Sequence, residues 1–230
     1  CSIYRAEGHD TNLQCAPMVM CENCKPGEPC FVPDNYKVYG ADEFGKVSGE
    51  ENMMQEIFQR GPIACGIATT PALKAYTSGV FKDDTGAMNI THDISIVGWG
   101  VEDGQNYWMV RNSWGSHYGE QGFVKIAKGI NNLNIESDCA WATPVDTWTE
   151  DKRHITTEAE KTDPRNKPAD NPIKSGFLKK EGGCLHELKF ENGEKPLDVM
   201  SWEEVNQDDL PENWDWRNVN GTNYASWNKN

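Results

Sequence analysis

Two short segments near the middle of the chain most restrict what it can fold into. Residues 91–100 and 107–115 are rich in β-branched and aromatic residues, and each ends in Trp and Gly. Side-chain alternation places His92 on one face of the first segment, and places Asn112 on the same face as Trp108 in the second. The pattern predicts neighbouring strands of a mostly antiparallel sheet or barrel that carry a His and an Asn.

One amphipathic helix is expected to pack on this sheet. The sequence Ser48-Gly49-Glu50-Glu51 has the pattern of a capping box, with Ser48 as the N-cap. Gly61 and Pro62 are expected to end the helix. Its apolar stripe, which we expect to face the core, is Met53, Met54, Ile57 and Phe58.

The composition restricts the class of protein. The formal net charge is −14, whereas a nucleic-acid-binding surface needs a basic patch, so nucleic acid is excluded as a partner. Hydrophobic residues make up 37% of the chain and include nine Trp, which is enough for a packed core. No apolar run approaches the ~18 residues that a membrane-spanning helix needs, so no membrane span is predicted.

The chain has eight cysteines. Five lie in the opening segment: Cys1, Cys15, Cys21, Cys24 and Cys30. The spacing of Cys21 and Cys24 occurs in zinc and redox sites, but no second close pair of Cys or His follows at ligand spacing. We therefore expect disulfides formed in an oxidising compartment, and no metal site. Cys65 and Cys139 are candidates to pair with each other, and the first five to crosslink the opening segment, although the sequence alone does not fix the connectivity.

Glycosylation sequons indicate the same compartment. They begin at Asn89 and Asn220, in Asn89-Ile90-Thr91 and Asn220-Gly221-Thr222. The chain starts at Cys1 without an initiating Met or a signal peptide. We expect a processed or truncated part of a secretory-pathway protein, either lysosomal or extracellular.

The pair His92 and Asn112 has the residue types that a thiol-dependent enzyme needs. An Asn carbonyl can orient an imidazole without adding a net charge, and a Trp two residues later, Trp114, can keep water away from that hydrogen bond. The surrounding strings, His-x-x-x-x-x-Gly-Trp-Gly and Asn-Ser-Trp-Gly-x-x-x-Gly-Glu-x-Gly, resemble the β-barrel, right-hand half of papain-family cysteine peptidases. Tyr118 departs from that family, in which Trp is usual at this position.

This resemblance covers roughly residues 1–148, the predicted β-barrel half. The polar segment 149–176 is expected to be a linker. Residues 177–209 resemble a short propeptide, and residues 210–230 resemble the amino terminus of a mature peptidase of this family. The resemblance also gives Cys184 a role, as a propeptide thiol that caps a catalytic cysteine, beside the alternative of a free or structurally paired cysteine.

The order of these parts is inverted relative to the family. In the family, the residues that follow such a mature amino terminus supply the nucleophile motif Cys-Gly-Ser-Cys-Trp and most of the helical, left-hand half, and neither is found within the 230 residues. Three arrangements fit: a fragment that spans two tandem units, one chain of a two-chain enzyme, or a rearranged pseudoenzyme. In each of them, residues 211–223 are expected to dock on the barrel of the same chain.

The sequence therefore predicts an α+β, papain-like fold that consists mainly of the β-barrel half with one helix. The resemblance implies a cysteine peptidase of the carboxypeptidase type, with His92 as the base, Asn112 as its orienting partner and Trp114 in support. It implies a peptide substrate, no cofactor and a nucleophile supplied from elsewhere, for instance by a second chain. The competing hypothesis is a catalytically dead binding or structural module.

Overall fold

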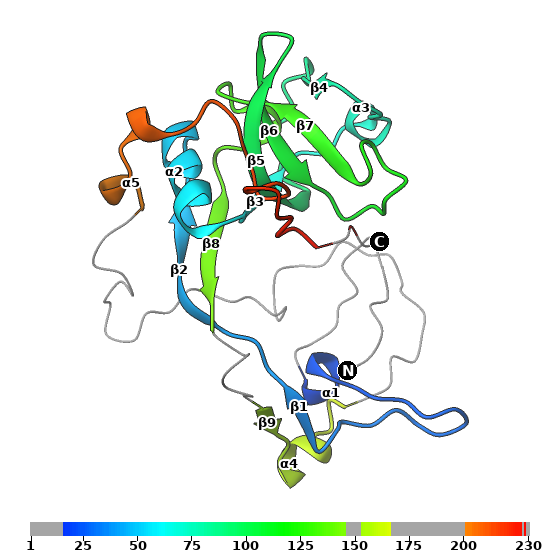
Figure 1. Cartoon of the computed structure of the whole chain (residues 1–230). Helices are drawn as coiled ribbons and strands as arrows, with labels where there is room; N and C mark the ends of the chain where they lie inside the picture. Colours follow the sequence, from blue (N-terminus) through cyan, green and yellow to red (C-terminus); the bar gives the residue numbers. More distant parts are fainter. Residues whose placement is uncertain (1–15, 146–152, 167–200, 227, 229–230) are drawn as a thin grey trace. The chain divides into compact units, whose positions relative to one another are not determined.

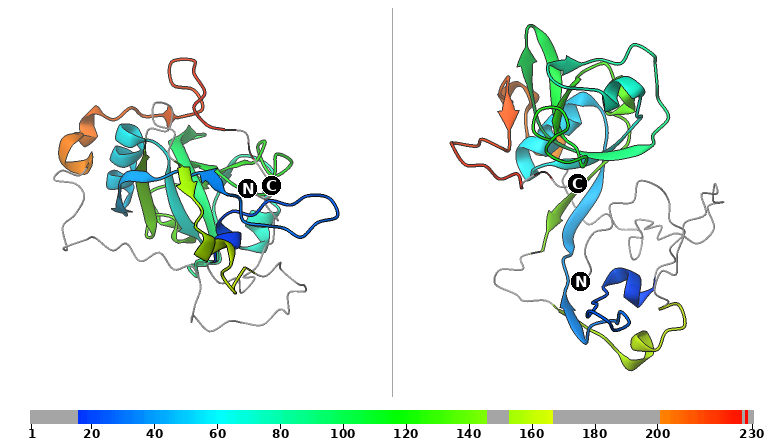
Figure 2. Two further views of the ribbon diagram at one scale, coloured as in Figure 1. Left: turned by 90° about the horizontal axis from the view of Figure 1, so that it is seen from below. Right: turned by 90° about the vertical axis from the view of Figure 1, so that its right-hand side faces the viewer.

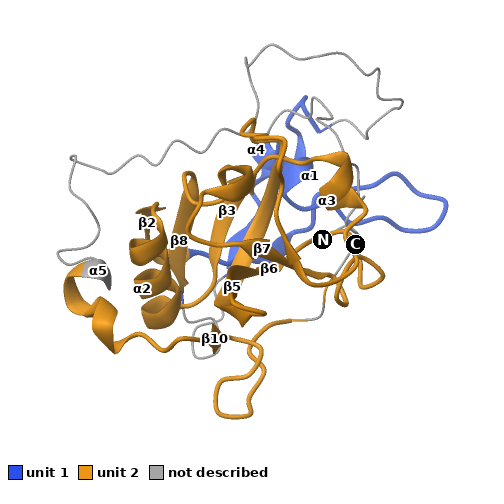
Figure 3. Ribbon diagram, turned by 90° about the horizontal axis from the view of Figure 1, so that it is seen from above, with its two compact units in different colours: residues 1–40, 145–194 blue, residues 41–144, 195–230 orange. Residues whose placement is uncertain are grey.

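The computed structural model describes residues 16–145, 153–166, 201–226 and 228 (Figure 1). The chain divides into two compact units (Figure 3). The smaller unit comprises residues 1–40 and 145–194, and the larger comprises residues 41–144 and 195–230. Within the described part, no helix is long and apolar enough to span a membrane.

The larger unit is built on one mixed sheet of eight strands, counted over the described residues. The strands are β2 (Ala41–Val47), β3 (Ile63–Ile67), β4 (Val80–Phe81), β5 (His92–Glu102), β6 (Gln105–Arg111), β7 (Phe123–Ala127), β8 (Cys139–Pro144) and β10 (Trp214–Asp215). Their order is β2-β8-β3-β5-β6-β7-β4, with β10 paired to β5. All pairs are antiparallel except β4 with β7. The expected α+β fold with a mostly antiparallel sheet is confirmed.

One helix, α2 (Glu50–Arg60), packs beside β2 and β8, and Figure 2 gives two further views of this arrangement. Met53 and Ile57 are fully buried against the sheet. The helix ends at Gly61, as the sequence predicted. The φ of Gly61 is 116°, which is costly for a residue with a side chain. The predicted capping box is wrong. Gly49 occupies the N-cap position and no side chain caps the helix, so the first turn begins one residue later than Ser48 would place it.

Short helical turns connect the strands of this unit. They are α3 (Pro71–Lys74), η1 (Asn132–Asn134), α5 (Ser201–Glu204) and η3 (Gln207–Asp209). The α3 turn begins where the Thr70 hydroxyl accepts a 3.2 Å hydrogen bond from the Leu73 N–H. Leu73 is fully buried, so this turn is held to the core next to the strands that carry the candidate site.

The carboxyl-terminal segment docks on the sheet of its own chain, as the sequence predicted. Trp214 of β10 pairs with Trp99 of β5. The indole N–H of Trp216 donates a 2.8 Å hydrogen bond to the carbonyl of Ile57, and that of Trp99 donates one of 3.1 Å to the carbonyl of Pro211. Trp214 and Trp216 are half-buried against the core rather than exposed to solvent.

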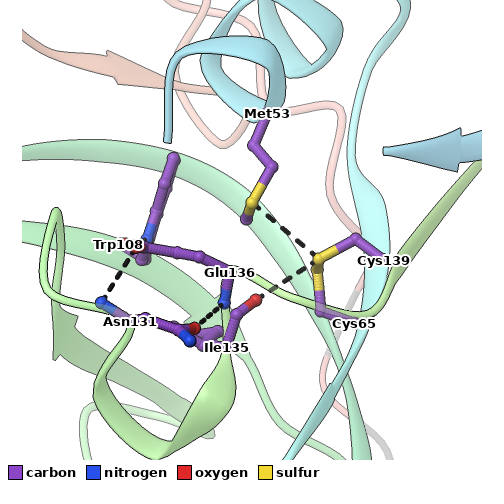
Figure 4. Close-up of a disulfide and its surroundings, with 7 residues drawn as sticks. All are labelled: Met53, Cys65, Trp108, Asn131, Ile135, Glu136 and Cys139. Carbon is purple, nitrogen blue, oxygen red and sulfur yellow. Dashed lines mark hydrogen bonds between the residues drawn. A yellow bond between two sulfur atoms is a disulfide. The ribbon is translucent and has the colours of Figure 1, made fainter. Parts of the chain in front are cut away.

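A disulfide joins Cys65 of β3 to Cys139 of β8 in the core of the larger unit (Figure 4). This is the pairing that the sequence suggested for these two cysteines. Nearby, the buried Glu136 carboxylate accepts hydrogen bonds from the Trp108 indole N–H at 2.9 Å and from the Asn131 backbone N–H at 2.9 Å. Breaking these hydrogen bonds would leave a buried carboxylate without donors, which is costly. They therefore stabilise the turn that precedes β8.

The smaller unit contains short elements only. They are α1 (Pro17–Met20), β1 (Asn35–Lys37), β9 (Arg153–Ile155) and α4 (Glu158–Lys161), with β1 and β9 paired antiparallel. A disulfide joins Cys24 to Cys30. Part of the segment predicted as a linker therefore has defined structure. There the α4 turn carries a capping box between Thr157 and Glu160 that its polar composition did not indicate.

Candidate active site

His92 and Asn112 come from neighbouring strands of the sheet. His92 is the first residue of β5, where its backbone pairs with Ile67 of β3, and its side chain is half-buried. Asn112 directly follows β6, is only 2% exposed, and donates its backbone N–H to the carbonyl of Gly122 at 3.0 Å. The β5–β6 pairing thus brings together two side chains that are twenty positions apart in the sequence.

The two side chains are hydrogen-bonded to each other. Nε2 of His92 lies 2.8 Å from Oδ1 of Asn112. The same oxygen accepts the backbone N–H of Ser113 at 2.8 Å, which fixes the orientation of the amide. Because a carbonyl oxygen only accepts, Nε2 must carry the proton in the neutral ring, and Nδ1 is left as the basic nitrogen. This is the tautomer that a base needs if it is to take a proton at Nδ1.

Aromatic rings cover this hydrogen bond. The Trp114 ring stacks on the His92 ring, with the centroids 4.8 Å apart and the planes inclined by 24°. Tyr118 meets Trp114 edge-on at 4.8 Å and donates its hydroxyl to the carbonyl of Leu73 at 2.8 Å. Burial raises the pKa of Tyr118 to about 12, and the nearby Asn112 side chain opposes that rise. Tyr118 is therefore a neutral donor that supports Trp114 at a position where the family usually has Trp.

The carboxyl-terminal segment also reaches this site. The amide nitrogen of Asn228 donates to the carbonyl of Asn112 at 2.6 Å and to that of Gly122 at 2.8 Å. Ser226 accepts a 3.0 Å hydrogen bond from the Arg111 guanidinium. Sequence reasoning did not find Asn228, because nothing local indicates a contact across 116 positions. The predicted docking of residues 211–223 was the only signal that pointed toward it.

The described cysteines are not available as nucleophiles. All five are disulfide-bonded: Cys21, Cys24, Cys30, Cys65 and Cys139. Cys1, Cys15 and Cys184 lie outside the described residues, so the proposed role of Cys184 stays a prediction. In the described part, sulfurs of Cys24 and Cys30 lie near a Glu22 carboxylate, but their joining as a disulfide leaves no thiolate to bind a metal.

The structure also describes the two sequon residues and two further histidines. Asn89 and Asn220, the sequon residues, are exposed. His117 is exposed in a turn. His154 belongs to the smaller unit, where its Nε2 lies 2.9 Å from a carboxylate oxygen of Glu160.

Comparison with known proteins shows the family to which the chain belongs. The sequence model of papain family cysteine proteases matches residues 6–143, which is more than half of the chain. The chain belongs to the papain family. Within that family, its motifs are similar to those of cathepsin X, also called cathepsin Z.

Two curated relatives agree with this placement. Over 154 residues the chain is 43% identical to cathepsin Z of Onchocerca volvulus, covering 63% of this chain and 48% of that protein. Over 100 residues it is 34% identical to cathepsin B-like cysteine proteinase 3 of Ostertagia ostertagi, covering 44% of this chain and 58% of that protein. A solved structure of procathepsin L2 from Tenebrio molitor larval midgut is 34% identical with a TM-score of 0.42, covering 45% of this chain and 34% of that one. The chain thus spans about half the length of the curated relatives it matches.

Proposed function

We propose that this chain supplies the base of a papain-type cysteine peptidase. His92 is the base, Asn112 orients it, and Trp114 shields the hydrogen bond between them. The observation that carries the proposal is the 2.8 Å contact between Nε2 of His92 and Oδ1 of Asn112, beneath the stacked Trp114 ring. Together with the family assignment, this geometry supports acyl transfer through a thiolate.

The chemistry follows from the tautomer. A cysteine thiol placed at Nδ1 of His92 gives its proton to that nitrogen, which leaves a thiolate beside an imidazolium. The thiolate attacks the peptide carbonyl, and the imidazolium returns the proton to the departing amine. Asn112 accepts the Nε2–H throughout, so the ring keeps its orientation while its charge changes.

The nucleophile belongs, in this proposal, to polypeptide that joins the site next to Asn228. That residue is hydrogen-bonded to the backbone of Asn112, one contact away from His92. Polypeptide that continues from this point, or a second chain that enters beside it, presents the thiol to the ring. The Cys-Gly-Ser-Cys-Trp motif of the family is the expected carrier.

The substrate class follows from the family. The papain family comprises cysteine proteases, so the substrate is a peptide or protein. We further propose trimming at the carboxyl end of the substrate, which the similarity to cathepsin Z supports. A lysosomal or extracellular location agrees with the disulfides Cys24–Cys30 and Cys65–Cys139, because such bonds persist in oxidising compartments.

The experiment is active-site labelling of native protein isolated from its source. A thiol-reactive epoxysuccinyl peptide is added at mildly acidic pH under mild reduction, and the labelled peptide is mapped by mass spectrometry. The expected result is a labelled Cys-Gly-Ser-Cys-Trp-type peptide that copurifies with this chain. His92→Ala should abolish the labelling, whereas His154→Ala, in the other unit, should leave it intact.

The competing function is a papain-like module that binds without catalysis. Copurification of the chain with no selectively reactive cysteine would overturn the peptidase proposal and favour this module. The hydrogen bond between His92 and Asn112 would then be present without a catalytic role.

A further inference from the structure

The α3 turn is hydrogen-bonded on two sides to segments of the candidate active site. On one side, the hydroxyl of Thr69 lies 2.8 Å from the hydroxyl of Thr91, which directly precedes His92. The Thr69 N–H also donates to that Thr91 oxygen at 3.2 Å. On the other side, the carbonyl of Leu73, inside the turn, accepts the Tyr118 hydroxyl at 2.8 Å. The turn therefore links the segment that leads into the base to the loop that follows β6.

That loop carries both candidate partners of the base, and Tyr118 contacts each part of it. The Tyr118 carbonyl accepts the Gly122 N–H at 2.7 Å, and the Gly122 carbonyl accepts the Asn112 N–H at 3.0 Å. The Tyr118 ring meets the Trp114 ring edge-on, with the centroids 4.8 Å apart. A displacement of Tyr118 would therefore reach Asn112 through the backbone and Trp114 through the ring contact.

The contact between Tyr118 and Leu73 is shielded from solvent. Tyr118 is 7% exposed and Leu73 is fully buried. Burial raises the pKa of Tyr118 to about 12, so its hydroxyl stays a neutral donor at neutral pH. A buried hydroxyl that loses its acceptor gains no water in exchange, which makes the loss costly. The hydroxyl is therefore a firm link between the turn and the loop.

We propose that Tyr118 is a positioning residue for the candidate base. Its hydroxyl, bonded to the carbonyl of Leu73, fixes the Trp114 ring in its stacked position over the imidazole. The α3 turn acts as a spacer, because its other contact fixes the segment next to His92. Without the hydroxyl, the Trp114 ring shifts and water reaches the hydrogen bond between His92 and Asn112. The inference rests on the proposed function only for the role of His92 as a base.

The experiment is proton NMR of the 230-residue chain at one neutral pH, so it does not depend on a nucleophile. The ring current of Trp114, stacked at 4.8 Å, moves the imidazole protons of His92 upfield. Tyr118→Phe removes only the hydroxyl, and we expect it to lose most of that upfield shift. Trp114→Leu gives the reference for complete loss.

Tyr76→Phe is the matched control. It makes the same chemical change at a buried ring of the same neighbourhood, whose centroid lies 6.1 Å from that of Tyr118. The Tyr76 hydroxyl donates to the carbonyl of Gly79 at 2.7 Å instead of to the α3 turn. The control should therefore leave the His92 shift unchanged, although it also loses a hydrogen bond.

A second variant tests the other contact of the turn. Thr69→Val should lose a smaller part of the upfield shift, because the N–H of residue 69 still donates to Thr91. This variant decides the question if Tyr118→Phe does not fold. The proposal is overturned by an unchanged His92 shift in folded Tyr118→Phe, or by an equal change in Tyr76→Phe. If Tyr118→Phe does not fold, an unchanged shift in Thr69→Val overturns it.

These outcomes are independent of the proposed function. The NMR shifts report the position of the Trp114 ring over His92, whereas the labelling experiment reports a reactive thiol. A chain that holds the ring through Tyr118 and yet copurifies with no reactive cysteine would keep this inference and lose the peptidase proposal.

Discussion

The backbone of Trp214 pairs with that of Trp99, so a strand from the far end of the chain completes the sheet that carries His92. The same segment ends at the site, where Asn228 is hydrogen-bonded to the carbonyl of Asn112. Docking of the carboxyl-terminal segment and support of the His–Asn pair are therefore one structural feature. A change that releases β10 should also disturb the site.

Gly98→Ala should release β10. A methyl group on Gly98 would lie 2.0 Å from the carbonyl oxygen of Trp214, and that oxygen belongs to backbone that cannot rotate away. We expect a loss of about 1–3 kcal/mol in the free energy of unfolding, together with faster proteolysis within residues 210–226. Chemical denaturation and limited proteolysis measure the two effects. Gly40→Ala is the control, because its added methyl group makes only an ordinary contact at 3.4 Å with Val145. Unchanged protection of the segment in Gly98→Ala would contradict the docking.

Asn112→Ala should release the His92 ring from a single tautomer. In the wild-type chain at neutral pH we expect the neutral ring to be protonated at Nε2, since Oδ1 of Asn112 accepts from it at 2.8 Å. In the variant both neutral tautomers should be populated, and ¹⁵N shifts of the imidazole nitrogens distinguish them. Asn106→Ala, at an exposed position on β6, should leave the shifts unchanged. A wild-type ring protonated at Nδ1 would show that the hydrogen bond is not formed in solution.

Removal of the Cys65–Cys139 disulfide should destabilise the larger unit. The bond closes a loop across 74 positions, and the chain-entropy estimate for a loop of that length is about 4 kcal/mol. We expect the double variant Cys65→Ala/Cys139→Ala to lower the free energy of unfolding by up to this amount, measured by denaturation followed through tryptophan fluorescence. The pair Cys24→Ala/Cys30→Ala, in the smaller unit, is the control. It should leave the unfolding transition of the larger unit, which contains the buried Trp108, unchanged. Equal losses in both double variants would argue against the loop-length explanation.

Acid should weaken the contacts of Glu120. Burial raises the pKa of this carboxyl, but hydrogen bonds from Lys125, the Gly79 N–H and the Tyr76 hydroxyl outweigh it and hold the pKa below the usual 4.5. A depressed folded-state pKa contributes stability that is present above 4.5 and is lost as the pH falls through the lower value. We expect Glu120→Gln to be less stable than wild type at pH 7, with the difference shrinking below pH 4.5. Denaturation curves at a series of pH values test this, and a difference that grows in acid would refute it.

Several elements could be predicted because their signals are local. The strand that contains His92 and the strand that leads to Asn112 are marked by β-branched and aromatic residues, and Gly61 marks the end of α2. The start of α2 could not be placed to the residue. Ser48 and Gly49 both suit an N-cap, and the position used depends on where the chain leaves β2.

Other features could not be predicted because they depend on contacts between distant segments. The α4 turn and β9 lie in a stretch whose polar composition indicated a linker, but β9 is paired with β1, more than a hundred positions earlier. A cleft of about 330 Å³ beside Trp114 is likewise lined by both Lys74 and His117, which share no sequence pattern.

The sequence by itself determined the family and the identity of the His–Asn pair, because the strings around His92 and Asn112 combine strand composition with specific residues at fixed spacing. Only the tertiary structure decided how those residues are arranged: which nitrogen of His92 faces Asn112, where Asn228 docks, and which groups surround the cleft. The reason is physical. Composition and periodicity report the local conformation of the backbone, whereas these contacts depend on the packing of strands whose register is set by the whole sheet.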